Sequence, residues 1–268
     1  MSVIIVIKRI KLYVNNNDKS IKNAKIVKDK FIRHGYTIDD KKYDLAVAVG
    51  GDGAFLRMVH SNNFDSNLYY VGVNSGTLGF AQEINLIYLD RFIEEINTDE
   101  IKIEEVGVEE TEVRSKNKID SFYSLNEIVV RYKDSKIVKL DVQIDNSYLE
   151  RFRGDGIIIA TSFGSTAHNL SYGGSIVYPD LSTLQITPIG PINSRAYQTL
   201  SNSLIVPKNR IIKLIPNSDD KAFTITSDGV LRKYQDISSI KTHVGDKKIK
   251  QLRMSTYSFA NKINEKLL

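Results

Sequence analysis

The apolar residues of the first hundred positions occur in short runs that predict the strands of a parallel sheet. Residues 45–49 form a valine-rich run without polar interruption, which favours a strand covered on both faces, and residues 68–73 form a second run of this kind. A further strand is predicted over residues 2–7. Helical patterns alternate with these runs, so residues 1–97 are predicted to fold as an α/β domain.

Helical spacing marks the segments between these strands. Asp18 is expected to begin a helix that ends near Gly35. Two more helices are predicted, one from near Gly53 and one over residues 85–96. The apolar face of the first helix is predicted to consist of Ile21, Ala24, Val27 and Phe31.

The period of the pattern changes after residue 97. Apolar and charged residues then alternate with a period of two, as in antiparallel strands. Residues 98–247 are therefore predicted to form an all-β, β-sandwich-like second domain, interrupted by one short helix at residues 165–172. A last helix within residues 248–268 is predicted to return to the first domain. Its apolar positions are Phe259, Ile263 and Leu267.

The composition excludes several kinds of site. No cysteine is present among the 268 residues, so disulfides, thiolate zinc sites and thiol nucleophiles are excluded. Magnesium bound through oxygen atoms stays compatible with the sequence. The histidines lack the spacing of a transition-metal site. They are His34, His60, His168 and His243.

Charge and targeting signals favour a cytoplasmic protein that binds small polyanions. The formal net charge of +5 comes from basic residues interspersed with acidic ones, and not from a basic stripe that would bind nucleic acid. The apolar start of the chain is too short, and is followed too soon by basic residues, for a signal peptide or a membrane span. We therefore expect no nucleic-acid or membrane partner.

A glycine turn follows the first buried strand. Gly50, Gly51 and Gly53 leave no side chain between the backbone and a ligand, and a helix starting here would direct free N–H groups toward a phosphate. Asp52 lies between them, and it is expected to act on a proton, to bind a metal or to cap the helix. The sequence matches neither the Walker loop nor the dinucleotide fingerprint. A second glycine-containing loop follows the next strand at residues 74–80.

Two polar segments of the second half have the chemistry to bind a nucleoside. Asn126 and Glu127 place an amide and a carboxylate where they can hold both hydroxyls of a ribose. Asp155, between two glycines, can accept a hydrogen bond from the exocyclic amine of adenine. Residues 164–167 predict a tight turn into a helix, next to His168, that a flat base or a phosphate can approach. Ordinary strand-end and turn roles are the alternatives for these residues.

Together these motifs resemble those of the NAD kinases. Gly-Gly-Asp-Gly at residues 50–53 is shared with diacylglycerol and sphingosine kinases and, more loosely, with phosphofructokinases. Residues 73–80, 125–127 and 153–168 match NAD kinase motifs in the same order, so the resemblance covers nearly the whole chain. It implies transfer of the γ-phosphoryl group of ATP, or of a polyphosphate phosphoryl, to the adenosine ribose 2′-hydroxyl of NAD, with Mg²⁺ as cofactor and NADP as product.

The resemblance also implies roles for individual residues. Asp52 would be the base that acts on the ribose hydroxyl, and Gly51 and Gly53 would bind the phosphates of ATP. The NAD site that the resemblance implies consists of Asp52, Gly53, Phe80, Asn126, Glu127, Arg153, Asp155, Phe163, Thr166, Ala167, His168, Ser171, Gly190 and Tyr197.

The chain departs from the family pattern at four places. Ala54 replaces a threonine, Leu125 replaces the first asparagine of Asn-Asn-Glu, residues 162–163 replace Pro-Thr, and His168 replaces a tyrosine. Two alternatives to an NAD kinase are a lipid kinase of the same superfamily and a non-catalytic dinucleotide-binding regulator. The first lacks support because no basic amphipathic anchor is present. The second conflicts with the retained Asp52.

The composition of residues 187–197 indicates that the chain forms an oligomer. This segment contains two prolines and a glycine, so a regular central strand is not expected, yet it is too apolar for a solvated loop. The resemblance implies that it lies at a subunit interface, with Gly190 and Tyr197 near the nicotinamide side of a partner's NAD. We therefore expect the chain to form a homo-oligomer, and specifically a tetramer. Packing of the segment within its own domain is the alternative.

Overall fold

The computed structural model describes residues 6–74, 79–116, 118–134, 136–217 and 221–268. The chain divides into two compact units, Met1–Val106 with Lys248–Leu268 (unit 1) and Gly107–Lys247 (unit 2). Strands β6 (Lys102–Ser115) and β17 (Ile237–Arg253) contribute residues to both units.

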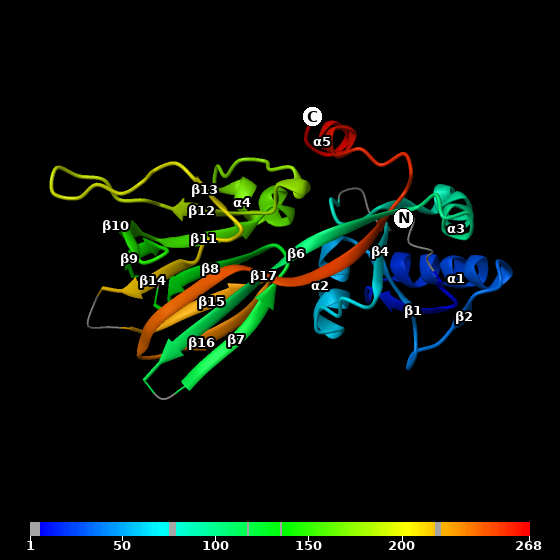
Figure 1. Ribbon diagram of the computed structural model, residues 1–268, viewed down its shortest axis with the longest axis horizontal. Helices are drawn as coiled ribbons and strands as arrows, with labels where there is room; N and C mark the ends of the chain where they lie inside the picture. The colour runs from blue at the N-terminus through cyan, green and yellow to red at the C-terminus, as the bar shows by residue number, and fades with distance from the viewer. Residues whose placement is uncertain (1–5, 75–78, 117, 135, 218–220) are drawn as a thin grey trace. The chain divides into compact units, whose positions relative to one another are not determined.

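Unit 1 is an α/β unit built on a parallel sheet (Figure 1). The strands are paired in the order β2-β1-β3-β4, and β5 and the last residues of β17 pair in parallel with β4. The α/β prediction is therefore confirmed. The elements of this unit, besides the shared strands, are β1 (Arg9–Val14), α1 (Asp18–Arg33), β2 (Thr37–Ile38), β3 (Leu45–Gly50), α2 (Asp52–Ser61), β4 (Tyr69–Asn74), β5 (Ile84–Asn85), η1 (Leu86–Tyr88), α3 (Leu89–Asn97) and α5 (Phe259–Leu267).

The strands of unit 1 follow the apolar runs with one exception. Every residue of β3 is buried, as expected for a parallel strand covered on both faces. The first strand is Arg9–Val14, and residues 6–8 are not in a strand, so the prediction for residues 2–7 is wrong at its end, while residues 2–5 lie outside the described residues. The continuous apolar run before Lys8 concealed the alternating pattern of β1, in which Ile10 is buried.

In two helices of unit 1, one residue of the predicted apolar face is exposed and a polar residue is buried. Helix α1 buries Ser20 in place of Ile21, which is 44% exposed. Ser20 lies on the same 3.6-residue stripe as the other inward residues, Ala24, Val27 and Phe31. Helix α5 buries Lys262, whereas Leu267 is exposed. The reason is a hydrogen bond, since the ammonium group of Lys262 donates to the carbonyl of Gln82 at 2.6 Å.

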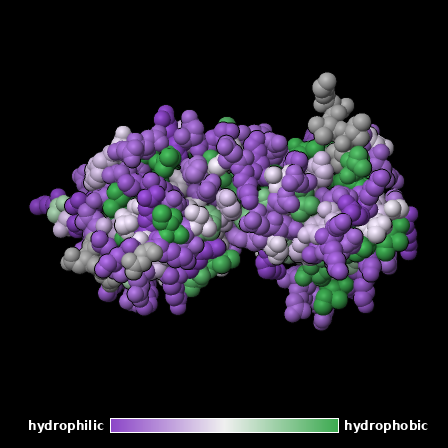
Figure 2. All heavy atoms as spheres, turned by 60° about the horizontal axis from the view of Figure 1, so that its bottom comes forward, coloured by the Kyte–Doolittle hydropathy of each residue, from purple (hydrophilic) through white to green (hydrophobic). Residues whose placement is uncertain are grey.

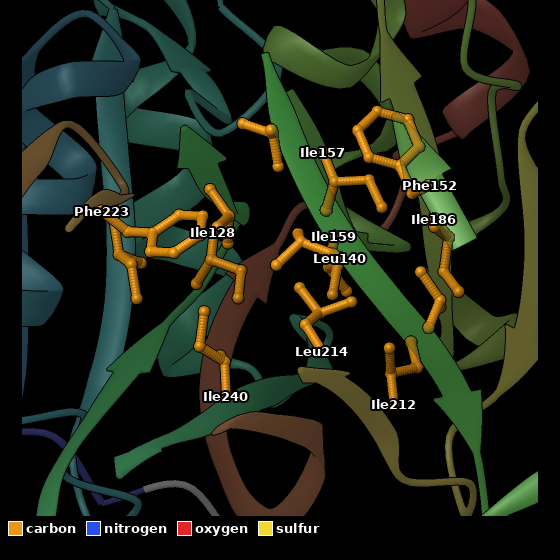
Figure 3. Close-up of a cluster of buried hydrophobic side chains, with 14 of the residues drawn as sticks. Ile128, Leu140, Phe152, Ile157, Ile159, Ile186, Ile212, Leu214, Phe223 and Ile240 are labelled. Carbon is orange, nitrogen blue, oxygen red and sulfur yellow. The ribbon is translucent and has the colours of Figure 1, made fainter. Parts of the chain in front are cut away.

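Unit 2 is a β-sandwich, and the β-rich prediction is confirmed. One sheet has the strand order β13-β12-β11-β8-β15-β16, and the other has β10-β9-β14-β17 with β6 and β7 alongside. Branched and aromatic side chains of both sheets form one buried cluster, as Figure 3 shows for Ile128, Ile159 and Leu214. The elements are β7 (Lys118–Ser124), β8 (Glu127–Tyr132), β9 (Val138–Ile144), β10 (Ser147–Gly154), β11 (Gly156–Thr161), η2 (Phe163–Thr166), α4 (His168–Ser171), η3 (Pro179–Leu181), β12 (Thr183–Ile189), β13 (Leu204–Pro207), β14 (Ile212–Pro216), β15 (Phe223–Ser227) and β16 (Val230–Tyr234).

Strand β12 is an interior strand although it contains Pro188. It pairs with β11 as far as Ile189, but with β13 only as far as Ile186. Pro188 thus lies beyond the part of β12 that β13 covers, at an open edge where a missing N–H is tolerated. The expectation that residues 187–197 avoid a regular strand is therefore wrong for Thr187, Pro188 and Ile189.

The surface drawn in Figure 2 is mostly hydrophilic. On this face, apolar residues form small separate groups. None of the helices in the described ranges is long and apolar enough to cross a membrane.

A buried acid in β6 predicts a pH dependence of stability. Burial raises the pKa of Glu109 to about 8 from its ordinary 4.5, although the hydroxyls of Ser124 and Thr242 donate to it at 2.9 and 2.7 Å. Because the folded pKa is the higher one, the stability that Glu109 contributes is fully present below pH 4.5 and is lost as the pH rises through 8.

We expect Glu109→Gln to flatten the decline in melting temperature between pH 4.5 and 8. Thermal melts at several pH values measure this. Glu110→Gln, on the opposite face of the same strand, is the matched control and is expected to keep the slope of the unaltered protein. Parallel curves for all three proteins would contradict the assignment.

Candidate functional site

The glycine turn in unit 1 joins β3 directly to α2. β3 ends at Gly50, Gly51 caps the helix with φ −99°, and Asp52 is the first helical residue. None of the glycines in this turn has a left-handed φ. A Cβ on Gly50 would lie 2.8 Å from the Cβ of Ala54, and a Cβ on Gly51 would meet nothing within 4 Å. The glycines therefore provide room for close packing and for a ligand, and not unusual backbone angles.

The carboxylate of Asp52 binds the chain that follows the second glycine loop. Oδ2 accepts from the N–H of Phe80 at 2.8 Å, and Oδ1 accepts from the N–H of Ala81 at 3.0 Å. A Cβ on Gly79 would lie 2.7 Å from Oδ1, so any side chain at this position would displace the carboxylate. These hydrogen bonds go to the loop and not to the start of α2. Residues 75–78 of that loop lie outside the described residues.

A buried lysine of α5 supports the same segment. The Nζ of Lys262 that donates to Gln82 also lies 3.6 Å from the carboxylate of Glu83. Burial lowers the pKa of Lys262 to about 8, because desolvation of the ammonium group outweighs the attraction of Glu83 and Asp52. The ring of Phe259 lies 6.3 Å from that of Phe80. Helix α5 therefore packs against the residues that contact Asp52, as predicted for the returning C-terminal helix.

A cavity of about 200 Å³ lies beside the turn. Arg57 donates to the Oδ1 of Asn15 at 2.7 Å, which holds a guanidinium group at this cavity near the start of α2. Positive charge at a helix N-terminus favours binding of an anion. Ala54 contributes a methyl group where the family pattern has a hydroxyl. The lining residues are Tyr13, Val14, Ala54, Arg57, Met58 and Ser61.

In unit 2, the Leu-Asn-Glu motif lies at the start of β8. Glu127 is only 7% exposed, and within the described part of the chain its Oε2 has no hydrogen-bond partner. Burial, and after it the charge of Asp228, raise the pKa of Glu127 to about 8. Asn126, next to it, is half-buried. A buried carboxyl oxygen without a protein partner is available to a hydroxyl of a ligand.

Glu127 and His168 line one cavity of about 280 Å³. Partial burial, followed by the charge of Arg131, lowers the pKa of His168, so the imidazole is neutral near pH 7. The structure therefore brings together the predicted ribose-binding carboxyl and the predicted adenosine-binding ring. The other lining residues are Val129, Arg131, Thr224, Thr226 and Gly229.

A larger cavity of about 610 Å³ contains Asp155 and Gly190. Gly190 has φ +53°, and a Cβ there would collide with the carboxylate of Asp155, so both conformation and space require glycine. Arg131 lines this cavity as well as the smaller one, and its guanidinium donates to the hydroxyl of Tyr172 at 3.0 Å. The remaining lining residues are Tyr132, Lys136 and Ile189.

Two further predicted residues contact each other. The guanidinium of Arg153 lies over the ring of Tyr197, 3.4 Å from its centroid. The backbone carbonyl of Arg153 also accepts from the N–H of Ile192 at 2.9 Å. These contacts attach residues 192–197 to the end of β10.

The remaining predicted residues lie on two consecutive short helices. Asn169 anchors them on β12, because its Nδ2 donates to Gln185 at 2.5 Å and its Oδ1 accepts from the hydroxyl of Thr187 at 2.5 Å. The predicted residues on η2, on α4 and between them are Phe163, Thr166, Ala167 and Ser171.

Two family models match the chain. The ATP-NAD kinase N-terminal domain matches residues 6–101, and the ATP-NAD kinase C-terminal domain matches residues 125–253. The NAD kinase of Finegoldia magna is 43% identical over 253 residues, which are 91% of this chain and 92% of that protein. NAD kinase 1 of Oceanobacillus iheyensis is 33% identical over 258 residues, 95% of this chain and 96% of that protein. The chain belongs to the NAD kinase family.

Solved structures of this family have the same fold. The yeast NADH kinase complexed with NADH gives a TM-score of 0.83 at 21% identity, covering 96% of this chain and 86% of that chain. The NAD kinase from Archaeoglobus fulgidus in complex with ATP gives a TM-score of 0.74 at 18% identity, covering 96% and 98%. These similarities agree with an N-terminal α/β part and a C-terminal β-rich part.

Three residues that bind the segments, or line the cavities, of the predicted NAD kinase residues were missed in the sequence. The burial of Lys262 was not predicted, because a lysine on an amphipathic helix normally lies on the solvent-exposed face. Asp228, which is followed by Gly229, signals a two-residue hairpin turn, but this signal does not reveal which strand the carboxylate binds. Arg131 occupies an ordinary outward position of a strand, and no sequence signal marks it. The site roles of the predicted residues stay predictions.

Proposed function

We propose that the chain transfers the γ-phosphoryl group of ATP to the adenosine ribose 2′-hydroxyl of NAD and so produces NADP. Membership of the NAD kinase family makes it a phosphotransferase. The observation that best supports a ribose as the group bound in unit 2 is the buried Glu127, whose Oε2 has no partner in the described part of the chain and which shares a cavity with His168.

In the proposed mechanism, Asp52 accepts the proton of the 2′-hydroxyl as its oxygen attacks the γ-phosphorus. The bond from this phosphorus to the bridging oxygen breaks, and ADP leaves with the electron pair. Asn126 and Glu127 hold the ribose hydroxyls, and Thr166, Ala167 and His168 contact the adenine. Alignment of the reactants and one carboxylate in reach of the nucleophile are the main requirements of this chemistry.

We propose that Mg²⁺ enters with ATP as part of the substrate. The triphosphate oxygens are the hard ligands that this ion prefers, and its charge neutralises the transferred group. The backbone N–H groups around Gly51 and Gly53 would bind the phosphates. Across the ranges that the structure describes, no group of three or more His, Cys, Asp or Glu side chains is arranged to hold a metal ion.

A single assay tests the proposed reaction. Purified protein with Mg-ATP is offered NAD, NADH or diacylglycerol, and NADP formation is followed with an NADP-specific dehydrogenase. Polyphosphate in place of ATP tests the donor. NADP formation supports the proposal, and phosphorylation of diacylglycerol alone would establish the lipid-kinase alternative. Binding of NAD without any turnover would establish the regulator.

A cytoplasmic location is part of the same proposal. The lack of cysteine in a chain of 268 residues fits a reducing compartment, where disulfides do not form. Cell fractionation with an antibody to the chain tests it, and recovery in the membrane or extracellular fraction would contradict it.

We propose that the chain forms a homotetramer in which residues 190–197 of one subunit contact the NAD bound by another. Residues Thr187–Ile189 belong to strand β12 and are paired within its sheet. In the segment that follows, the side chains of Ile192 and Tyr197 are 36% and 45% exposed. The exposed Tyr197 ring is stacked on the guanidinium of Arg153, and tyrosine and arginine are the residue types that contribute most often to the binding energy of an interface.

Tyr197→Ala is therefore expected to weaken NAD binding at least about tenfold, since a buried interface aromatic contributes that much or more. Calorimetric titration measures the affinity, and light scattering measures the mass. Tyr148→Ala is the matched control, because Tyr148 is 61% exposed and lines neither cavity of unit 2. A monomer that keeps full specific activity on dilution would refute the tetramer.

A further inference from the structure

The β15–β16 turn binds the Leu-Asn-Glu motif through one carboxylate. The Oδ2 of Asp228 accepts from the N–H of Leu125 at 2.6 Å, and its Oδ1 accepts from the N–H groups of Asn126 and Glu127 at 2.8 and 3.3 Å. The N–H of Asp228 donates in return to the carbonyl of Glu127 at 3.2 Å. A residue distant in the sequence thus binds four backbone groups of the motif.

Thr161, at the end of β11, binds the two remaining backbone groups. Its hydroxyl donates to the carbonyl of Leu125 at 2.6 Å, and its N–H donates to the carbonyl of Asn126 at 2.8 Å. The same hydroxyl accepts from the N–H of Gly164 at 3.0 Å. A Cβ on Gly164 would overlap the backbone of Asn126. The backbone of the motif is therefore fixed on both sides.

The turn that carries Asp228 is itself rigid. Ser227 pairs with Val230, so Asp228 and Gly229 form a two-residue hairpin loop, with φ values of +47° and +84°. Aspartate and glycine are the residues that tolerate two left-handed positions in such a loop. Gly229 also lines the cavity that contains Glu127 and His168. The loop therefore places the carboxylate of Asp228 at a fixed point behind the motif.

We propose that Asp228 is a positioning residue for the dinucleotide ribose, because it holds the backbone of residues 125–127 so that Asn126 and Glu127 face the ligand. This inference rests on the proposed function. Charged acceptors of backbone N–H groups make the stronger hydrogen bonds, so a carboxylate that accepts from three N–H groups orders the segment better than a neutral side chain. An asparagine at the same place would direct its NH2 group, which is a donor, toward one of these backbone N–H groups, which is also a donor.

The charge of Asp228 has a second effect, on the ionisation of Glu127. Burial is the larger cause of the raised pKa of Glu127, and the negative charge of Asp228 adds to it. Glu127 is also faced by Glu109 of β6 and by the backbone N–H of His168, and it shares a cavity with Arg131. Ribose hydroxyls donate to the ionised carboxylate, so kcat/KM for NAD is expected to rise with pH as Glu127 ionises around pH 8.

The test is the pH profile of kcat/KM for NAD in Asp228→Asn. We expect the plateau to fall at least about tenfold, since hydrogen bonds to a charged group are lost. We also expect the rising limb to move to lower pH, because a negative charge near Glu127 is removed. KM for ATP is expected to stay unchanged. Thr161→Val is expected to lower the plateau without moving the limb, since no charge changes.

Asp236→Asn is the matched control. Asp236 also has a left-handed φ, +52°, in the connection between β16 and β17, and it lines neither cavity, so an unchanged profile is expected. Slow hydrogen exchange at the amides of residues 125–127 in the unaltered protein is expected as well, and does not depend on the folding of any variant. Fast exchange there, or an unmoved limb in Asp228→Asn, would overturn the inference. Failure of the unaltered protein to form NADP would instead refute the proposed function.

Discussion

Asp52→Asn is expected to lower kcat for NADP formation by at least about a hundredfold, since a positioned base contributes that much or more. The carboxylate lies at the start of α2, and both of its oxygens are held by the N–H groups of Phe80 and Ala81. This orientation is fixed before any substrate binds, which is what a base in phosphoryl transfer requires. Steady-state kinetics with NAD and Mg-ATP measure the effect.

A purely structural role for Asp52 predicts a different result. An amide can accept from only one of the two N–H groups, so Asp52→Asn also costs about 1–3 kcal/mol of stability, as for any lost buried hydrogen bond. If this loss were the whole effect, thermal stability and NAD affinity would fall together with kcat. We expect NAD affinity, measured by calorimetry, to stay within about threefold, because the lost proton transfer belongs to the transition state alone.

Gly79→Ala provides a matched control for the position of the carboxylate. The added methyl group would lie 2.7 Å from the Oδ1 of Asp52, so it displaces the carboxylate without changing its charge. We expect kcat to fall by a smaller factor than in Asp52→Asn, because a displaced base still accepts a proton. Near-normal turnover in Asp52→Asn would show that this side chain serves only to fix the loop.

The sequence predicts those parts of the fold in which the pattern of apolar residues alone decides which side chains are buried. β3 is apolar throughout, and the two-residue period after residue 97 is that of a sandwich, so both were predictable. The burial of Lys262 was not predictable, because it depends on a hydrogen bond to a carbonyl that compensates for removing the ammonium group from water. The position of Pro188 within a strand was not predictable, because a proline is tolerated there only where β13 no longer pairs with β12.

The candidate site is only partly readable from the sequence for a related reason. Motifs such as Gly-Gly-Asp-Gly carry their chemistry in consecutive residues, and their order identifies the family. The contacts that orient them come from distant positions. Asp228 binds residues 125–127 from another hairpin, and no local pattern encodes that pairing. Local spacing therefore predicts the groups that act on a ligand, and tertiary structure determines the groups that hold them.

Asn126→Ala and Glu127→Gln are each expected to raise KM for NAD at least about tenfold, the effect of losing a hydrogen bond to a buried or charged group. KM for ATP should change by less than about threefold, because the proposed roles of both side chains concern the acceptor ribose alone. Steady-state kinetics with each substrate varied in turn measure the two constants. A change confined to the ATP constant would show that the residues bind the donor.

The pH profile separates Glu127 from a residue that merely fills space. Its pKa of about 8 means that the carboxyl is mostly protonated at pH 7 and becomes an acceptor for ribose hydroxyls as the pH rises. The unaltered protein should therefore gain kcat/KM for NAD as the pH rises through about 8 and reach a plateau above it, whereas Glu127→Gln, which cannot ionise, should lack this rise. Asn126→Ala should lower the whole profile and keep the rise, because the titrating group is still present. A rise that persists in Glu127→Gln would assign the titration to another group and leave Glu127 without its proposed role as the ionising ligand of the ribose.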